Sequence, residues 1–441
     1  MRQKLESGLV DLRWLLVLGV IALFAFHWAT VARTAVDVPY WDEWEALRPE
    51  ALPNGLTWSW LTARHTDNRM LLTNLQIWVL YKAGGWNVAL QQVLNFGLFG
   101  LLLAGLGLWA RRNVEGLGPG TIAFFLAFTL SPLLYESHSM GGQSCFHLSL
   151  LFFMLAVLSL LQDDLPPRRL AAGIAFAWLS MNSHASGLSF CGALVLCFSL
   201  FKLSRLLGTN DPSLRRMHVM HLAAALAVVG LGVWLWSRGY QRHPDYPDMA
   251  WPYGLAFWRF YANLVSLGFG MDQLSMTLGL LCVAAAAAPV SLVFARKGPA
   301  VGVPFWRVST MIVGILTCLA VIAAARAGLG LDWSKTSRYF EFSVMLVPLS
   351  AMAWSMALRE ARSRRLALGL LAAFCLLGFA NNWDFSVYSL IASHRRAGLA
   401  CLAEAMRGGP DLCKEVYPWP LGDKLERAKA LKLSFTRGPR R

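Results

Sequence analysis

A polar stretch directly after the first apolar run holds the side chains best suited to acid–base chemistry. Residues 37–45 read Asp-Val-Pro-Tyr-Trp-Asp-Glu-Trp-Glu, which places four carboxylates among three aromatic rings. A carboxylate on such a loop is able to act as a general base toward a hydroxyl group. Partial desolvation by Tyr40, Trp41 and Trp44 would raise the pKa of that carboxylate. The alternative is a solvated loop whose acids cap helices or pair with Arg33.

A second candidate group lies far along the chain. Arg338 and Tyr339 are expected to open a helix, and Lys335 comes just before them. The free backbone amides of a helix N-terminus, together with Arg and Lys side chains, form a favourable phosphate site. The sequence therefore predicts a phosphate site here. Ordinary anchoring of Arg and Tyr at a membrane interface is the alternative.

Polar residues in other expected loops are weaker candidates for binding sugar hydroxyls or an acceptor. They are His65, Asp67, Arg69, Glu136, His138, Gln143, Asn182, His184, Arg242 and His243. His65 and Asp67 supply two ligands without a third at a fixed spacing, so no obligatory metal ion is expected. The sequence holds no glycine-rich phosphate loop and no nucleophile elbow, which gives nucleotide hydrolysis and serine hydrolysis no support.

The composition places this chemistry in a membrane protein. The chain has 441 residues, of which 56% are hydrophobic and 15% charged, and its mean hydropathy is +0.47. These values are too apolar for a soluble domain of this length. Apolar runs long enough to cross a bilayer recur to about residue 382. We expect an all-α transmembrane domain over residues 1–385 and a short tail over residues 386–441.

The net charge of +15 does not predict a nucleic-acid partner, because the positions of the basic residues have another explanation. Lys and Arg gather at the ends of apolar runs, where they mark the cytoplasmic side. This rule gives about eleven spans, with a cytoplasmic N-terminus and a C-terminus outside. The first run, residues 14–32, has no small-residue cleavage site and is expected to remain as a helix. The loop over residues 33–86 then lies on the outer side with most of the polar chemistry.

Two more segments are expected on the outer side. Residues 252–270 are rich in aromatic side chains but are interrupted by Arg259 and Asn263, which predicts an amphipathic helix lying at the outer interface. Cys401 and Cys413 lie close together in the tail. They would form a disulfide if the tail is extracytoplasmic, and two free thiols are the alternative.

Four short segments together resemble a known family. Residues 38–44 (Val-Pro-Tyr-Trp-Asp-Glu-Trp), 65–69 (His-Thr-Asp-Asn-Arg), 337–339 (Ser-Arg-Tyr) and 416–418 (Val-Tyr-Pro) are similar to a bacterial group of the GT-C class of membrane glycosyltransferases. The resemblance covers nearly the whole chain. It implies a GT-C-like helical bundle with amphipathic helices on the outer side. It also implies a polyprenyl-phosphate-linked sugar donor and a glycan or lipid acceptor at the periplasmic face of the inner membrane.

The resemblance also implies a role for individual residues. An acid of the first outer loop acts as the base, which corresponds to Asp42, with Glu43 as the alternative. Arg338 would hold the lipid phosphate, and Tyr339 and Lys335 belong to the same phosphate site. The implied reaction is an inverting displacement without a cofactor. Because no large soluble domain is expected after the last helix, the loops and the tail would recognise the acceptor.

Two other hypotheses for the function stay open. A flippase, polymerase or ligase for an envelope polysaccharide would also use outer-side acids and a basic phosphate pocket. A flippase should carry charged residues deep in its helices, whereas the deep polar residues are few, His27 and Asn95 among them. A structural partner of an envelope assembly would not need the acids at all.

Overall fold

The computed structural model describes residues 2–65, 68–238, 240, 246–271, 276–380 and 382–437. It is 78% helical. The described part contains one small sheet, in which β1 (Arg64–His65) pairs antiparallel with β2 (Asn68–Arg69). The predicted all-α class is therefore confirmed.

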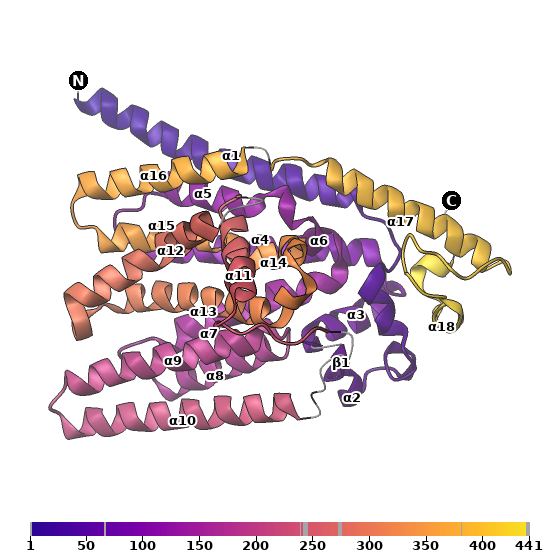
Figure 1. The fold of residues 1–441 in the computed structure, drawn as a ribbon, viewed down its shortest axis with the longest axis horizontal. Coiled ribbons are helices and arrows are strands. Elements are labelled where there is room, and N and C mark those ends of the chain that lie inside the picture. The colour runs from indigo at the N-terminus through magenta and orange to yellow at the C-terminus, as the bar shows by residue number, and fades with distance from the viewer. Residues whose placement is uncertain are drawn as a thin grey trace.

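Long apolar helices lie alongside one another and form a bundle (Figure 1). Within the described residues, eight helical segments are long and apolar enough to cross a membrane, and one bent pair adds a ninth candidate. The eight segments belong to α1 (Arg2–Thr34), α4 (Val88–Asn113), α7 (Ser144–Leu160), α9 (Ser186–Leu207), α10 (Pro212–Ser237), α12 (Met276–Lys297), α13 (Val303–Arg326), and α14 (Ser337–Val344) with α15 (Leu346–Ala357). The chain is a multi-pass membrane protein.

The bent pair and two further helices decide how many times the chain crosses. α5 (Pro119–Ala127) and α6 (Tyr135–Ser139) belong to the pair, whose two halves meet at 46°. α8 (Pro167–Met181) is short for a span, and α16 (Ala361–Phe379) begins with an Arg-rich turn. The expected count of eleven includes all of these and stays a prediction.

Shorter elements gather at one end of the bundle, and the N-terminus lies toward the other end (Figure 1). Most belong to the first loop, which joins α1 to α4, and to the tail, residues 386–437. They are the 3₁₀ helices η1 (Trp41–Leu47), η2 (Leu52–Asn54) and η9 (Ser434–Thr436), and the helices α2 (Trp58–Leu61), α3 (Leu71–Gly84), α17 (Ser386–Ala405) and α18 (Gly422–Ala430).

The first loop and the tail fold together around a small core of their own. Trp44 is fully buried there, with its ring 5.6 Å from Phe435 and 6.4 Å from Tyr417. The amide of Trp41 donates to the carbonyl of Val416 at 2.8 Å. The tail is therefore part of the structure that carries residues 37–45. It also contains a disulfide between Cys401 and Cys413, the first of the two alternatives above.

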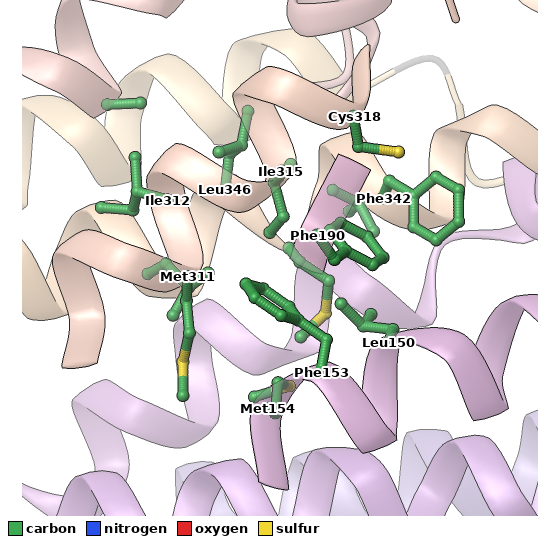
Figure 2. Packing of buried hydrophobic residues seen from close by; sticks show 14 of the residues in the cluster. Leu150, Phe153, Met154, Phe190, Met311, Ile312, Ile315, Cys318, Phe342 and Leu346 are labelled. Carbon is green, nitrogen blue, oxygen red and sulfur yellow. The ribbon is translucent and has the colours of Figure 1, made fainter. Parts of the chain in front are cut away.

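The main core runs through the bundle, and Figure 2 shows the part of it that lies between α7, α9, α13, α14 and α15. The rings of Phe153 and Phe190 stack at 4.6 Å, and Phe190 meets Phe342 edge-on at 5.4 Å. Gly314 allows α13 to approach the Phe153 ring closely, because a Cβ at this position would lie 2.4 Å from the ring. The start of α14 is thus held against α7 and α13 by close packing.

The aromatic segment 252–270 forms a helix, as predicted, over most of its length. α11 (Leu255–Leu267) exposes Arg259, but Phe260 and residues 261–267 are buried against α12, α13 and α14. Asn263 is buried as well, and its side-chain amide donates to the hydroxyl of Ser334 at 2.5 Å. The second half of α11 is thus buried in protein, and its predicted position along the outer interface stays a prediction.

Candidate functional site

A cavity of about 1310 Å³ opens where the first loop meets the bundle, and it is called the main cavity below. Asp42 and His65 reach it from the first loop. Arg338 and Lys335 reach it from α14 and from η8 (Leu331–Lys335), the turn before α14. The structure therefore brings together the two groups of residues that the sequence singled out as base and phosphate ligand.

Asp42 presents its carboxylate to the main cavity from the first turn of η1. Its Oδ2 lies 3.9 Å from Arg338 Nη1 and 3.8 Å from His65 Nε2, and 57% of the side chain is exposed. His65 lowers the pKa of Asp42 most strongly; burial opposes this effect, and Arg338 adds to it. Burial does raise the pKa, as predicted, but the prediction of a net increase is wrong for Asp42 because His65 and Arg338 outweigh burial.

The residue before Asp42 has a strained backbone. Trp41 has φ +49°, in the left-handed region that residues with a Cβ rarely adopt. The hydrogen bond from its backbone amide to the Val416 carbonyl fixes the backbone. Trp41 is 44% exposed and lines the main cavity. Such conformations persist only where the surroundings impose them, and they are concentrated at functional sites. The strain helps to aim Asp42 into the cavity.

Glu43 turns the other way and is buried. Its carboxylate accepts hydrogen bonds from the amides of Tyr40, at 2.8 Å, and Gly142, at 2.9 Å. Arg395 Nη2 lies 4.0 Å from Glu43 Oε2, and the guanidinium also covers the Tyr40 ring at 4.9 Å. Burial raises the pKa of Glu43 although Arg395 opposes it. Of the adjacent acids, Asp42 has the carboxylate open to a substrate, and Glu43 joins three segments.

The last acid of the stretch, Glu45, connects the first loop to the tail. Glu45 accepts hydrogen bonds from Lys424 Nζ at 2.6 Å and from the Tyr417 hydroxyl at 2.8 Å. Burial would raise the pKa of Glu45, but the bonds from Lys424 and Tyr417 outweigh it and lower the pKa. Glu45 is thus already paired and is not a free base.

The start of α14 supplies side chains for an anion more than backbone amides. The amide of Arg338 donates to Glu136 Oε2 at 3.2 Å, so a carboxylate of the chain occupies part of the helix N-terminus. This contradicts the prediction that the amides are free to bind phosphate. The guanidinium lies at the wall of the main cavity with the side chain 31% exposed, and its Nε has no hydrogen-bond partner among the described residues. Lys335 and Tyr339 also line the main cavity, and Lys335 Nζ lies 3.7 Å from Asp332.

The weaker candidates divide into three groups. Glu136 and Gln143 line the main cavity, as His65 and His184 do. His138 is fully buried and bonds the Tyr388 hydroxyl at 3.1 Å, and Arg69 donates to the Thr62 carbonyl at 2.7 Å. Neither His138 nor Arg69 lines the cavity, because each side chain is hydrogen-bonded to a neighbouring group of the protein instead. Asp67, Arg242 and His243 lie outside the described residues.

The sequence analysis named His27 among the few deep polar residues but did not single out His147 and Glu341, which also lie inside the bundle. His147 of α7 and Glu341 of α14 are completely buried, with Nδ1 and Oε1 2.5 Å apart. His27 of α1 bonds the Tyr388 hydroxyl at 2.6 Å. More polar residues therefore lie deep in the bundle than the sequence analysis predicted. A single acid or histidine within an apolar run of the sequence could have indicated these buried ionisable residues.

No group of three or more His, Cys, Asp or Glu side chains in the described ranges is arranged to hold a metal ion. The expectation that no metal is obligatory stays a prediction.

Comparisons of the chain with protein-family models, with curated proteins and with solved structures found no match. The geometry of the main cavity is therefore the basis for a functional proposal.

Glu43→Gln is expected to destabilise the protein strongly, because it leaves the buried Arg395 without its counter-charge. Breaking a buried ion pair from one side costs about 3–5 kcal/mol. Thermal unfolding of the detergent-solubilised protein measures the effect. The double variant Glu43→Gln, Arg395→Met should recover part of the loss, and native stability of Glu43→Gln alone would contradict the assignment.

Proposed function

We propose that this chain is a GT-C type membrane glycosyltransferase. It moves a sugar from a polyprenyl-phosphate-linked donor to a glycan or lipid acceptor at the periplasmic face of the bacterial inner membrane. The observation that carries the proposal is the position of Asp42 Oδ2, 3.9 Å from Arg338 Nη1 on the wall of the main cavity. One cavity then offers a base for the acceptor and a cation for a phosphate leaving group.

The two kinds of wall of the main cavity suit an amphiphilic donor. Arg338 and Lys335 form a basic part, whereas Val321, Ile322 and Ala325 of α13 line an apolar part. Val321 is 48% exposed and belongs to a segment apolar enough to cross a membrane. A lipid-linked sugar phosphate needs this combination, because its head group is charged and its chain stays in hydrocarbon.

The proposed reaction is a single displacement with inversion. Asp42 takes the proton of the acceptor hydroxyl while the hydroxyl oxygen bonds to the anomeric carbon of the donor sugar. The bond from that carbon to the phosphate oxygen breaks, and the electron pair leaves with the lipid phosphate. Arg338 and Lys335 stabilise the phosphate charge. A lipid phosphate leaves readily without protonation, so one base is sufficient.

The disulfide of the tail supports the orientation of the proposed site. Disulfides form and persist in oxidising compartments such as the bacterial periplasm. Cys401 and Cys413 lie in the segment that packs against residues 37–45, so Asp42 is on the same side of the membrane as the disulfide. A periplasmic reaction is consistent with both features.

Asp42→Asn should reduce sugar transfer by about 100-fold or more, the usual contribution of a general base. Binding of the donor should change little, because the amide keeps the size of the carboxylate. Release of polyprenyl phosphate from polyprenyl-phosphate sugars by purified protein measures transfer. Asp384→Asn is the matched control, since Asp384 is exposed outside the cavity and its carboxylate accepts hydrogen bonds from Ser386. Normal turnover by Asp42→Asn would refute the base assignment.

Arg338→Gln should weaken donor binding, because it removes charge-assisted hydrogen bonds to the phosphate. Such bonds contribute about 1.5–3 kcal/mol, which corresponds to roughly 10- to 100-fold in Kd. Titration with a short-chain polyprenyl phosphate measures the change. Arg396→Gln, an exposed arginine of α17, serves as the control. Equal affinities for Arg338→Gln and the control would show that the phosphate binds elsewhere.

A flippase for a lipid-linked glycan is the second candidate, because ionisable side chains lie deep in the bundle. The buried pair of His147 and Glu341 is the specific observation, since such groups commonly mark substrate or proton pathways in membranes. In liposomes with a fluorescent lipid-linked sugar, a flippase would move the lipid across the bilayer, and Glu341→Gln would stop the movement. A transferase is expected to leave the label on its original side with or without Glu341→Gln.

A further inference from the structure

A second hollow of about 550 Å³ lies between the first loop and the tail. Glu45, Arg48 and Trp419 line both this hollow and the main cavity, so the two spaces adjoin. We propose that the second hollow binds a neutral sugar chain and, if the proposed transferase function holds, presents the acceptor end of that chain to Asp42. The binding itself does not depend on the transfer chemistry.

The charges in the second hollow are compensated by one another. Arg48 Nε lies 3.7 Å from Glu45 Oε2, and Lys424 Nζ lies 2.6 Å from Glu45 Oε1. Arg427 Nη2 lies 3.4 Å from Asp423 Oδ2. A charged ligand would have to displace these partners. A neutral chain of hydroxyl groups can donate to the carboxylates and accept from the cations without breaking the pairs.

Exposed aromatic rings at the junction of the two spaces suit the apolar face of a sugar. Trp419 is 61% exposed, and its ring meets that of Tyr417 edge-on at 5.3 Å. Pro418 and Pro420 on either side restrict its backbone. Trp41, 44% exposed, lines the main cavity as well. The C–H face of a sugar ring packs on such rings while its hydroxyls bond the polar groups around them.

Hydrogen bonds between the first loop and the tail hold the walls of the second hollow in place. Arg427 Nη1 donates to the carbonyl of Leu47 at 3.0 Å, and the Tyr417 hydroxyl donates to Glu45 at 2.8 Å. These bonds join α18 and the segment after the disulfide to η1. A preformed surface loses little conformational entropy on binding, which favours a weakly interacting ligand such as a sugar chain.

The test measures binding of neutral hexasaccharides of glucose, mannose and N-acetylglucosamine to the full-length protein in detergent by saturation-transfer NMR. We expect at least one of them to bind and Trp419→Ala to weaken its affinity roughly tenfold, the equivalent of a stacking contact of about 1.4 kcal/mol. Trp419→Phe should fall in between. Trp58→Ala is the matched control, because Trp58 is a tryptophan of the first loop that is 72% exposed and lines neither space.

Three results would overturn the proposal: no binding of any neutral hexasaccharide, equal weakening by Trp419→Ala and Trp58→Ala, or tighter binding of hexagalacturonate, an acidic chain of the same length. If the wild-type protein bound the sugar but released no polyprenyl phosphate, the transferase proposal would fail and the binding site would stand. If it released polyprenyl phosphate while Trp419→Ala bound normally, only the second hollow would be misassigned.

Discussion

The buried carboxylate of Glu43 is the interaction on which the arrangement of the site depends. It bonds the amides of Tyr40 in the first loop and Gly142 before α7, and it faces Arg395 of α17. A buried charge is tolerated only when it is paired and hydrogen-bonded. Those partners come from three segments far apart in the sequence, so satisfying this charge requires the loop, the bundle and the tail to meet at one point.

α7 connects this point to the phosphate side of the main cavity. Gly142, which bonds Glu43, lies in the turn before α7, and His147 on the first turns of α7 bonds Glu341 of α14. Asp42 is next to Glu43, and Arg338 lies one helical turn before Glu341. Both halves of the proposed site are therefore bonded to α7 or to the turn before it. This rigid helix keeps Asp42 and Arg338 at a fixed separation.

The sequence predicted the membrane class and the partners Asp42 and Arg338, because apolar run lengths and short motifs are local properties. It could not distinguish Asp42 from Glu43, since adjacent carboxylates differ only in the direction each turns, and contacts with distant segments decide that direction. The lowered pKa of Asp42 likewise depends on His65 and Arg338 across the cavity. The burial of His138 and of α11 depends on neighbours that no local pattern reveals.

The pairing of Asp42 with Arg338 bears on how one cavity could hold a cation and a base together. Without a donor, His65 and Arg338 keep the pKa of Asp42 low, so the carboxylate is charged but weakly basic. In the proposed reaction, a lipid phosphate that engages Arg338 offsets part of this positive charge and adds a negative charge nearby. Both changes raise the pKa of Asp42. The base would thus become stronger only when the donor is in place, which favours transfer to an acceptor that arrives afterwards.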